Sequence, residues 1–182
     1  VGFNRRFSPM AQKLKNLIGN ENDIPINIVI NINAGFIPDD SWIQDMNIGG
    51  GRIIGEVCHF IDLATFFTSS LVKQVCMSSM GNNFNKNTDN VSILLKYSNG
   101  SNASINYFSN GSKAYSKEKI EVYSQNRTVV IDNWKKMYAY GFKNFNKMSH
   151  SQDKGQFNQF KSVLDSFNKG NPEIIPFNEI VN

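Results

Sequence analysis

The sequence predicts an α+β protein in which helices pack on one face of an open, mostly antiparallel, mixed sheet. Three observations carry this prediction. Apolar and polar residues alternate in several short runs, Asn99-Gly100 stands between two of these runs, and three longer segments repeat apolar residues at helical spacing. A length of 182 residues with 40% hydrophobic content is enough for one core, so we expect a single domain over residues 1–182.

The first half of the chain predicts a helix, a strand and a second helix. Ser8-Pro9 is a typical helix start, since serine can cap free N–H groups and proline suits the first helical position. We therefore expect a helix over Pro9–Ile18. Isoleucine alternates with asparagine in residues 26–34, which predicts a half-buried strand. Apolar residues at helical spacing from about 51 to 67 predict the second helix.

The second half predicts hairpins followed by a last helix. Asn99-Gly100 and Gln125-Asn126 are the expected turns. The expected strands are 71–80, 91–97, 103–107, 120–123, 128–131 and a shorter one at 137–140. Residues 157–167 trace an amphipathic helix, which should end at Gly170-Asn171-Pro172.

Composition excludes several classes of protein. The net charge of +4 and the pI near 9.0 come from scattered lysines without a basic stripe or a binding motif, so we expect no nucleic-acid partner, although the basicity would suit an anionic substrate. Cys58 and Cys76 are too few and too far apart for a disulfide framework, which favours a reducing compartment. No apolar run or signal segment indicates a membrane. We expect a cytoplasmic protein.

The two ends of the sequence suggest a piece of a larger protein. The apolar Val1-Gly2-Phe3 runs straight into Asn4-Arg5-Arg6 with nothing before it, and the chain stops abruptly at Val181-Asn182. We therefore expect that residues 1–8 leave a preceding domain and that the C-terminus is truncated.

Glu56 and His59 are the candidate catalytic pair. Three residues apart on a regular helix, they would share a face and place a carboxylate beside an imidazole. Such a carboxylate favours the imidazolium and orients the ring, and an imidazole can take the proton of an alcohol while a hydride leaves its carbon. The alternative is that His59 is a packing residue and that Asp62 bonds to backbone groups. No second histidine stands nearby, so we expect no metal site.

Gly49-Gly50-Gly51 before the second helix is open to two interpretations. Free N–H groups there could cradle an anion, or the glycines could simply form a tight turn into the helix. They are not a dinucleotide fingerprint, because the G-x-G-x-x-G pattern is absent. Arg5, Arg6 and Arg52 could each hold a phosphate or carboxylate, or could form surface salt bridges.

Together these segments resemble the C-terminal region of the glucose-fructose oxidoreductase, inositol dehydrogenase and rhizopine-catabolism (Gfo/Idh/MocA) family. Residues 1–9 (VGFNRRFSP) are similar to the family's segment that leaves the nucleotide-binding domain, residues 33–38 (NAGFIP) with Trp42 and Asp45 to its substrate loop, and residues 49–62 to its catalytic helix. The resemblance spans nearly the whole chain. It implies the open sheet and one-sided helices expected above.

The resemblance also implies a function. The family joins a Rossmann domain that binds NAD or NADP to a domain that walls a sugar or polyol site and often mediates oligomerisation, so we expect a homo-oligomer formed through the sheet face. It implies that His59 acts at the substrate hydroxyl or carbonyl and that Arg5, Asn33, Trp42 and Asp45 line the pocket. A partner lysine of the Rossmann domain is missing from this chain. Many members have an aspartate where this sequence has Gly55.

Three functions are consistent with these residues. The first is an NAD(P)-dependent dehydrogenase of a sugar, nucleotide-sugar or polyol hydroxyl, in which the piece represented by this chain would be inactive alone. The second is an NAD-dependent glycoside hydrolase of the same fold, and the third is a non-enzymatic sugar-sensing or oligomerisation module.

Overall fold

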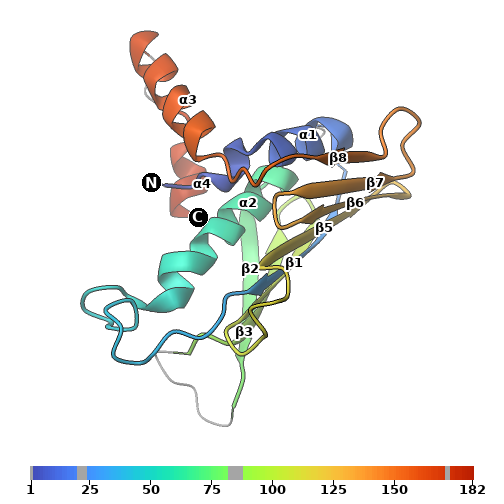
Figure 1. Cartoon of the computed structure of the whole chain (residues 1–182). Coiled ribbons are helices and arrows are strands. Elements are labelled where there is room, and N and C mark those ends of the chain that lie inside the picture. The colour runs from blue at the N-terminus through green and yellow to red at the C-terminus, as the bar shows by residue number, and fades with distance from the viewer. Residues whose placement is uncertain (1, 20–23, 82–87, 171–172) are drawn as a thin grey trace.

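The computed structural model describes residues 2–19, 24–81, 88–170 and 173–182 (Figure 1). Val1 and the expected helix stop at Asn171-Pro172 lie outside the described residues. Within them, one mixed sheet carries helices on one of its faces, which confirms the predicted fold class.

Eight strands form the sheet in the order β2-β3-β4-β1-β5-β6-β7-β8. β1 pairs parallel with β4, and all the other neighbours pair antiparallel. The strands are β1 (Asn27–Asn33), β2 (Val72–Ser79), β3 (Val91–Tyr97), β4 (Asn102–Phe108), β5 (Glu118–Ser124), β6 (Arg127–Asp132), β7 (Lys136–Tyr140) and β8 (Lys147–Ser149).

Alternation along β1 separates the two faces of the sheet. Ile28, Ile30 and Ile32 are buried under the helices, whereas Asn27 and Asn31 lie on the opposite face, which carries no helix. Ile30 stands opposite one isoleucine of β4 and one of β5, so the middle of the sheet is apolar on its helix side. We call the opposite, largely polar surface the open face.

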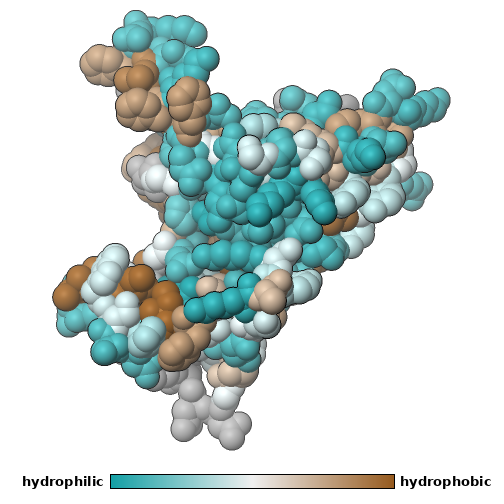
Figure 2. Space-filling model, in the orientation of Figure 1, coloured by the Kyte–Doolittle hydropathy of each residue, from teal (hydrophilic) through white to brown (hydrophobic). Residues whose placement is uncertain are grey.

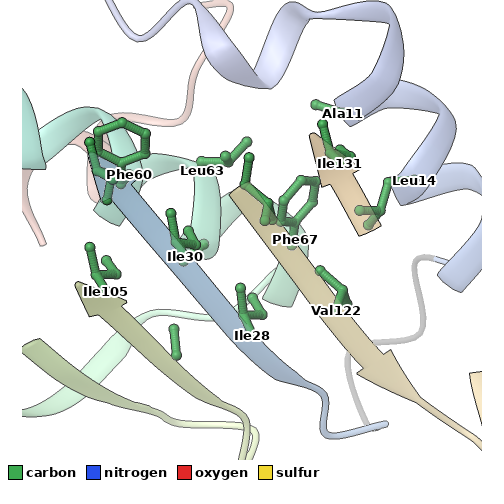
Figure 3. Packing of buried hydrophobic residues seen from close by; sticks show 14 of the residues in the cluster. Ala11, Leu14, Ile28, Ile30, Phe60, Leu63, Phe67, Ile105, Val122 and Ile131 are labelled. Atoms are coloured by element: carbon green, nitrogen blue, oxygen red, sulfur yellow. The ribbon is translucent and has the colours of Figure 1, made fainter. Parts of the chain in front are cut away.

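Two helices cover the core. α1 (Pro9–Ile18) begins as predicted, since the Ser8 hydroxyl accepts a hydrogen bond from the Ala11 N–H at 3.0 Å. α2 (Cys58–Thr68) follows a π-helical turn, η2 (Ile53–Val57). Figure 3 shows side chains of both helices over the strands: Ala11, Leu14, Phe60, Leu63 and Phe67 face Ile28, Ile30, Ile105, Val122 and Ile131. The short helices η1 (Arg5–Phe7) and α4 (Phe177–Val181) complete the helical layer.

The last long helix, α3 (Gln156–Asn168), has no buried residue and projects away from the sheet (Figure 1). Its limits agree with the amphipathic helix expected at 157–167, but its apolar side faces solvent. The exposed side chains are Phe157, Phe160, Val163, Leu164 and Phe167, with Phe167 78% exposed.

Four elements of the described structure were not anticipated from the sequence. They are the strand β8, the helix α4, the 3-10 helix η1 and the π-helical turn η2. β8 has three residues and α4 has five, so neither is long enough to show a periodic pattern. Among the described residues, no helix is long and apolar enough to cross a membrane.

We predict that Ile30→Ala lowers the free energy of unfolding by about 3 kcal/mol, because Ile30 is fully buried and the substitution leaves a cavity. Val29→Ala, one residue away on the open face, should cost well under half of that. Urea denaturation followed by circular dichroism measures both. If both variants lost the same unfolding free energy, the assignment of Ile30 to the buried face and Val29 to the open face would be contradicted.

Candidate functional site

The loop before η2 is closed by its own backbone. The N–H groups of Gly49 and Gly50 both donate to the Asp45 carbonyl, at 2.8 and 2.9 Å, and the Gly51 N–H donates to the Ile43 carbonyl at 3.1 Å. These donors are therefore occupied, so the interpretation of the glycines as an anion cradle is wrong and the tight-turn interpretation is confirmed. A Cβ on Gly49 would meet the Trp42 carbonyl oxygen at 2.5 Å, which explains the glycine.

Arg52 fastens this loop to the helix that follows. Its buried guanidinium donates to the carbonyls of Gly35 at 2.6 Å and Ala34 at 3.2 Å, and to the Glu56 carboxylate at 3.2 Å. Asp89 lies 3.5 Å from Nη1 of the same group. Since its donors point at protein oxygens, the geometry favours a positioning role for Arg52 over direct contact with an anion.

The Glu56 carboxylate is held from the side of the sheet. The hydroxyl of Tyr107 in β4 donates to Oε2 at 2.7 Å, while Arg52 bonds to Oε1. Burial, followed by the bond to Glu56, raises the pKa of Tyr107 well above its ordinary value, so the phenol stays a donor. Glu56 is consequently tied to two residues that the sequence did not pair with it.

His59 lies in the first turn of α2, and its half-buried ring contacts the edge of Phe3, with centroids 5.8 Å apart. Its Nδ1 is buried and has no hydrogen-bond partner. Burial lowers the pKa of His59, the nearby Arg5 cation lowers it further, and Glu118 and Glu56 oppose the change. Glu56 thus favours the imidazolium, as expected of a neighbouring carboxylate, but desolvation and Arg5 outweigh the two carboxylates.

Arg5 faces a carboxylate that the sequence did not single out. Its Nε and Nη2 donate to the two oxygens of Glu118 at 3.0 and 2.9 Å, and its guanidinium carbon lies 4.5 Å from the ring centre of Phe60. Lys154 Nζ and Trp134 Nε1 also donate to Glu118, at 2.7 and 2.6 Å. Burial alone would raise the pKa of Glu118, but Arg5 and Lys154 hold it at about 2.

A second buried pair joins the N-terminal segment to α2. Arg6 bonds both carboxylate oxygens of Asp62 and also donates to Glu179 in α4 at 2.9 Å. The carboxylate of Asp62 is thus held by a side chain, and the expectation that it bonds to backbone groups is wrong. Arg5 and Arg6 are both committed to buried carboxylates, so the surface salt bridge interpretation does not hold for either.

Asn33 lies on the open face, across the sheet from α2. Its Nδ2 donates to the Ser112 carbonyl at 2.7 Å, and it lines a cavity of about 330 Å³ together with Asn31, Ile32, Phe108, Asn110, Gly111, Ser112 and Tyr115. Trp42 and Asp45 are exposed in the loop between β1 and η2, where Asp45 also accepts from the Asn47 N–H. The structure therefore gathers His59 and Arg5 on one side and separates Asn33 from them.

Two residues of this region were missed by sequence reasoning, Glu118 and Tyr107. In the alternating strands β5 and β4, both side chains lie at positions that face the helices. A carboxylate at a position that the alternation reserves for apolar residues is the sequence signal that could have marked Glu118. Among the described residues, no group of three or more His, Cys, Asp or Glu side chains could hold a metal ion.

Comparison with known families decides the assignment of the chain. The model of the GFO/IDH/MocA C-terminal domain matches residues 25–130, more than half of the sequence. The chain belongs to this family. The match covers β1, the loop to η2, all of α2 and the strands from β2 to β5. His59, Glu56 and Glu118 therefore lie within it, whereas Phe3 and Arg5 lie before it. No curated protein sequence matches the chain.

Solved structures share the fold at low sequence identity. UDP-N-acetylglucosamine 3-dehydrogenase GnnA from Acidithiobacillus ferrooxidans has a TM-score of 0.72 and 16% identity, covering 94% of this chain and 53% of that one. An oxidoreductase domain protein from Kribbella flavida has a TM-score of 0.77 and 15% identity, with coverages of 99% and 60%. GenD2 from gentamicin A biosynthesis, in complex with NAD, has a TM-score of 0.69 and 14% identity, with coverages of 98% and 56%.

The chain thus spans a little over half the length of these structures. Its neighbours are oxidoreductases and dehydrogenases, and the family to which it belongs is one of oxidoreductases.

Gly49→Ala should open the loop between β1 and η2, since the new methyl group would clash with the backbone at Trp42 and Ile43. The local cost should be about 2 kcal/mol. Gly50→Ala is the matched control, because its Cβ meets nothing within 4 Å and only a φ of +71° opposes it, at about 1 kcal/mol. Limited proteolysis of the 36–50 segment measures the opening, and faster cleavage of the Gly50 variant would refute this account.

Glu118→Gln should lower stability in a pH-dependent way. The folded pKa of about 2 lies below the ordinary 4.5, so the ionised carboxylate stabilises the fold fully above pH 4.5, and this contribution disappears as the pH falls toward 2. The difference in unfolding free energy between wild type and variant should be about 3 kcal/mol at pH 7 and should shrink below pH 4.5. Chemical denaturation at a series of pH values measures it. A difference that is constant from pH 7 to pH 2.5 would contradict the assignment.

Proposed function

We propose that this chain is the C-terminal, substrate-binding domain of an NAD(P)-dependent oxidoreductase that acts on the hydroxyl of a sugar, nucleotide-sugar or polyol, with His59 as its acid/base. The observation that carries the proposal is the state of His59 within a domain of this family. The imidazole is half-buried at the start of α2, its Nδ1 has no partner, and its pKa is lowered. A neutral ring at pH 7 is ready to accept a proton.

The chemistry needs a base at the substrate oxygen. When an alcohol is oxidised to a carbonyl, the carbon loses a hydride and the oxygen loses a proton. A bound nicotinamide would supply the hydride acceptor. His59 would take the proton in the forward direction and return it in reduction. Burial beside Phe3 shields part of the ring from water, and this burial together with the charge of Arg5 disfavours the imidazolium.

Two apolar surfaces support the presence of another domain against this one. Figure 2 shows one of them over the loop that leads to η2 and the other over α3, with hydrophilic surface between them. The loop patch consists of Phe36, Trp42, Met46, Ile48 and Ile54, and the α3 patch consists of Phe157, Phe160, Val163, Leu164 and Phe167. Exposed apolar patches of this kind mark interaction sites. They fit contact with a cofactor-binding domain of the same protein.

The remaining site residues divide by their contacts. Trp42, which is 65% exposed, and Asp45 are free to contact a substrate, and they stay predicted pocket residues. Arg52 and Glu56 act by holding η2 in place: Arg52 donates to the Gly35 carbonyl in the preceding loop, and Glu56 accepts from Tyr107 in the sheet. The Asn33 side chain lies on the open face and so would not contact a substrate beside His59 directly. It would influence that pocket only by positioning the loop that follows β1.

Names of related structures support the substrate class and the cofactor. GnnA is a UDP-N-acetylglucosamine 3-dehydrogenase, and GenD2 was solved with NAD. We extend a nicotinamide cofactor and a sugar-type substrate to the protein that contains this chain, and leave the choice between NAD and NADP open.

The open face of the sheet is where we expect a second copy to pair. Its centre carries cross-strand amide bonds, from Asn106 to Asn31 at 2.8 Å and from Asn102 to Asn27 at 3.2 Å. Three exposed tyrosines, at positions 123, 138 and 140, lie along the same face. The charged side chains next to β1 on this face, Lys119 and Glu121, pair with each other at 2.8 Å. A broad surface whose central amides and charges are already paired can be buried at a lower desolvation cost.

In the protein that joins this chain to a dinucleotide-binding domain, His59→Asn should reduce turnover by about 10²–10⁴-fold with little change in stability, because the proton loses its acceptor. His150→Asn is the matched control, since His150 is the other histidine of the sequence and lies near the short strand β8. Initial rates of NADH or NADPH formation over a panel of sugars and polyols measure the effect. Full turnover by the His59 variant would overturn the assignment.

A further inference from the structure

Glu118 occupies an unusual position for a carboxylate. It is the first residue of β5, its side chain has no exposed surface, and it lies on the helix side of the sheet opposite Ile32 of β1. Removing a carboxylate from water costs several kcal/mol and is tolerated only with well-placed donors. Four donor bonds meet it, two from Arg5 and one each from Lys154 and Trp134.

The geometry connects this carboxylate to the candidate acid/base. The guanidinium of Arg5 lies between Glu118 and the ring of Phe60, the residue directly after His59. A salt bridge that served only to join chain segments would not need its cation placed over the first turn of α2. The position of Arg5 therefore places a fixed positive charge near His59, and the net effect of this charge on the His59 pKa depends on the opposing charge of Glu118.

The charged groups around His59 act in opposite directions. Arg5 disfavours the imidazolium, whereas Glu118 in β5 and Glu56 in η2 favour it. Glu56 is already neutralised in part by Arg52 at 3.2 Å. Cys58 and Asp62 stand on the same helix, and Asp62 is paired with Arg6. Glu118 is thus the carboxylate that directly offsets the nearest cation.

We propose that Glu118 is a positioning residue for His59: it fixes Arg5 against the first turn of α2 and offsets part of its charge. A base works best when its proton affinity lies near the working pH. Arg5 without Glu118 would make His59 too weak a base, and Glu118 without Arg5 would make it too readily protonated. The inference rests on the proposed role of His59 for its importance to catalysis, but the electrostatic coupling itself does not.

The test measures the pKa of His59 by NMR titration of ¹³C-histidine in the full protein, with its signal identified by its loss in His59→Asn. Arg5→Met should raise this pKa by about half a unit or more, and Glu118→Gln should lower it by a similar amount. Glu121→Gln is the matched control. Glu121 lies on the same strand but on the open face, where it bonds Lys119 and Tyr123, and it should leave the pKa unchanged.

Opposite shifts from the two partners of one salt bridge are a result that simple loss of structure cannot give. If Glu118→Gln does not fold, the single variant Arg5→Met is compared with the double variant Arg5→Met/Glu118→Gln. The inference then requires a lower His59 pKa in the double variant than in the single one. Shifts of the same sign, or none from Glu118→Gln in either background, would overturn the inference.

The pH profile of turnover separates this inference from the proposed function. If the pH profile moves together with the pKa of His59, both the coupling to Glu118 and the acid/base role of His59 are supported. If the pKa moves and the profile does not, the coupling stands and His59 is not the acid/base.

Discussion

The buried carboxylate of Glu118 is the interaction on which the arrangement of this domain depends most. It draws together the segment before α1, the turn between β6 and β7 and the segment before α3, through Arg5, Trp134 and Lys154. Trp134 is fully buried with a φ of +57°, a conformation that bulky residues rarely adopt, and its indole bond to Glu118 helps to hold it there. In a low-dielectric interior each of these bonds is strong, and losing one partner leaves a charge unpaired.

Local signals in the sequence were sufficient for much of the fold. The limits of α1 agree with the prediction because its start depends on Ser8 and Pro9, which act within one turn. The hairpin at Gln125-Asn126 was also predicted, and both residues adopt the positive φ that such a turn requires. The specific parallel pairing of β1 with β4 was not predictable in this way, since it joins segments about 75 residues apart.

The candidate site was less predictable because its contacts are not local. The three-residue spacing of Glu56 and His59 suggested a pair, but the carboxylate oxygens bond Tyr107, far along the chain, and Arg52, so Glu56 acts on His59 through its charge. Arg5 was expected either to hold a phosphate or carboxylate or to form a surface salt bridge, yet nothing near it in the sequence identifies Glu118 as its partner. Asn33 is different, since its parity with Asn27 and Asn31 places it on the open face. Alternation in β1 already contained that information.

The π-helical turn at the entrance to α2 gives the domain a place where sequence length can change. A widened turn contains one residue more than an α-helical turn, so losing that residue would restore a regular helix and rotate everything before it by about 100° relative to α2. The loop with Trp42 and Asp45 would then be aimed elsewhere, while His59 and the core contacts of Phe60 and Leu63 stayed in place. A single deletion in Ile53–Val57 would thus redirect the loop and leave the proposed acid/base where it is.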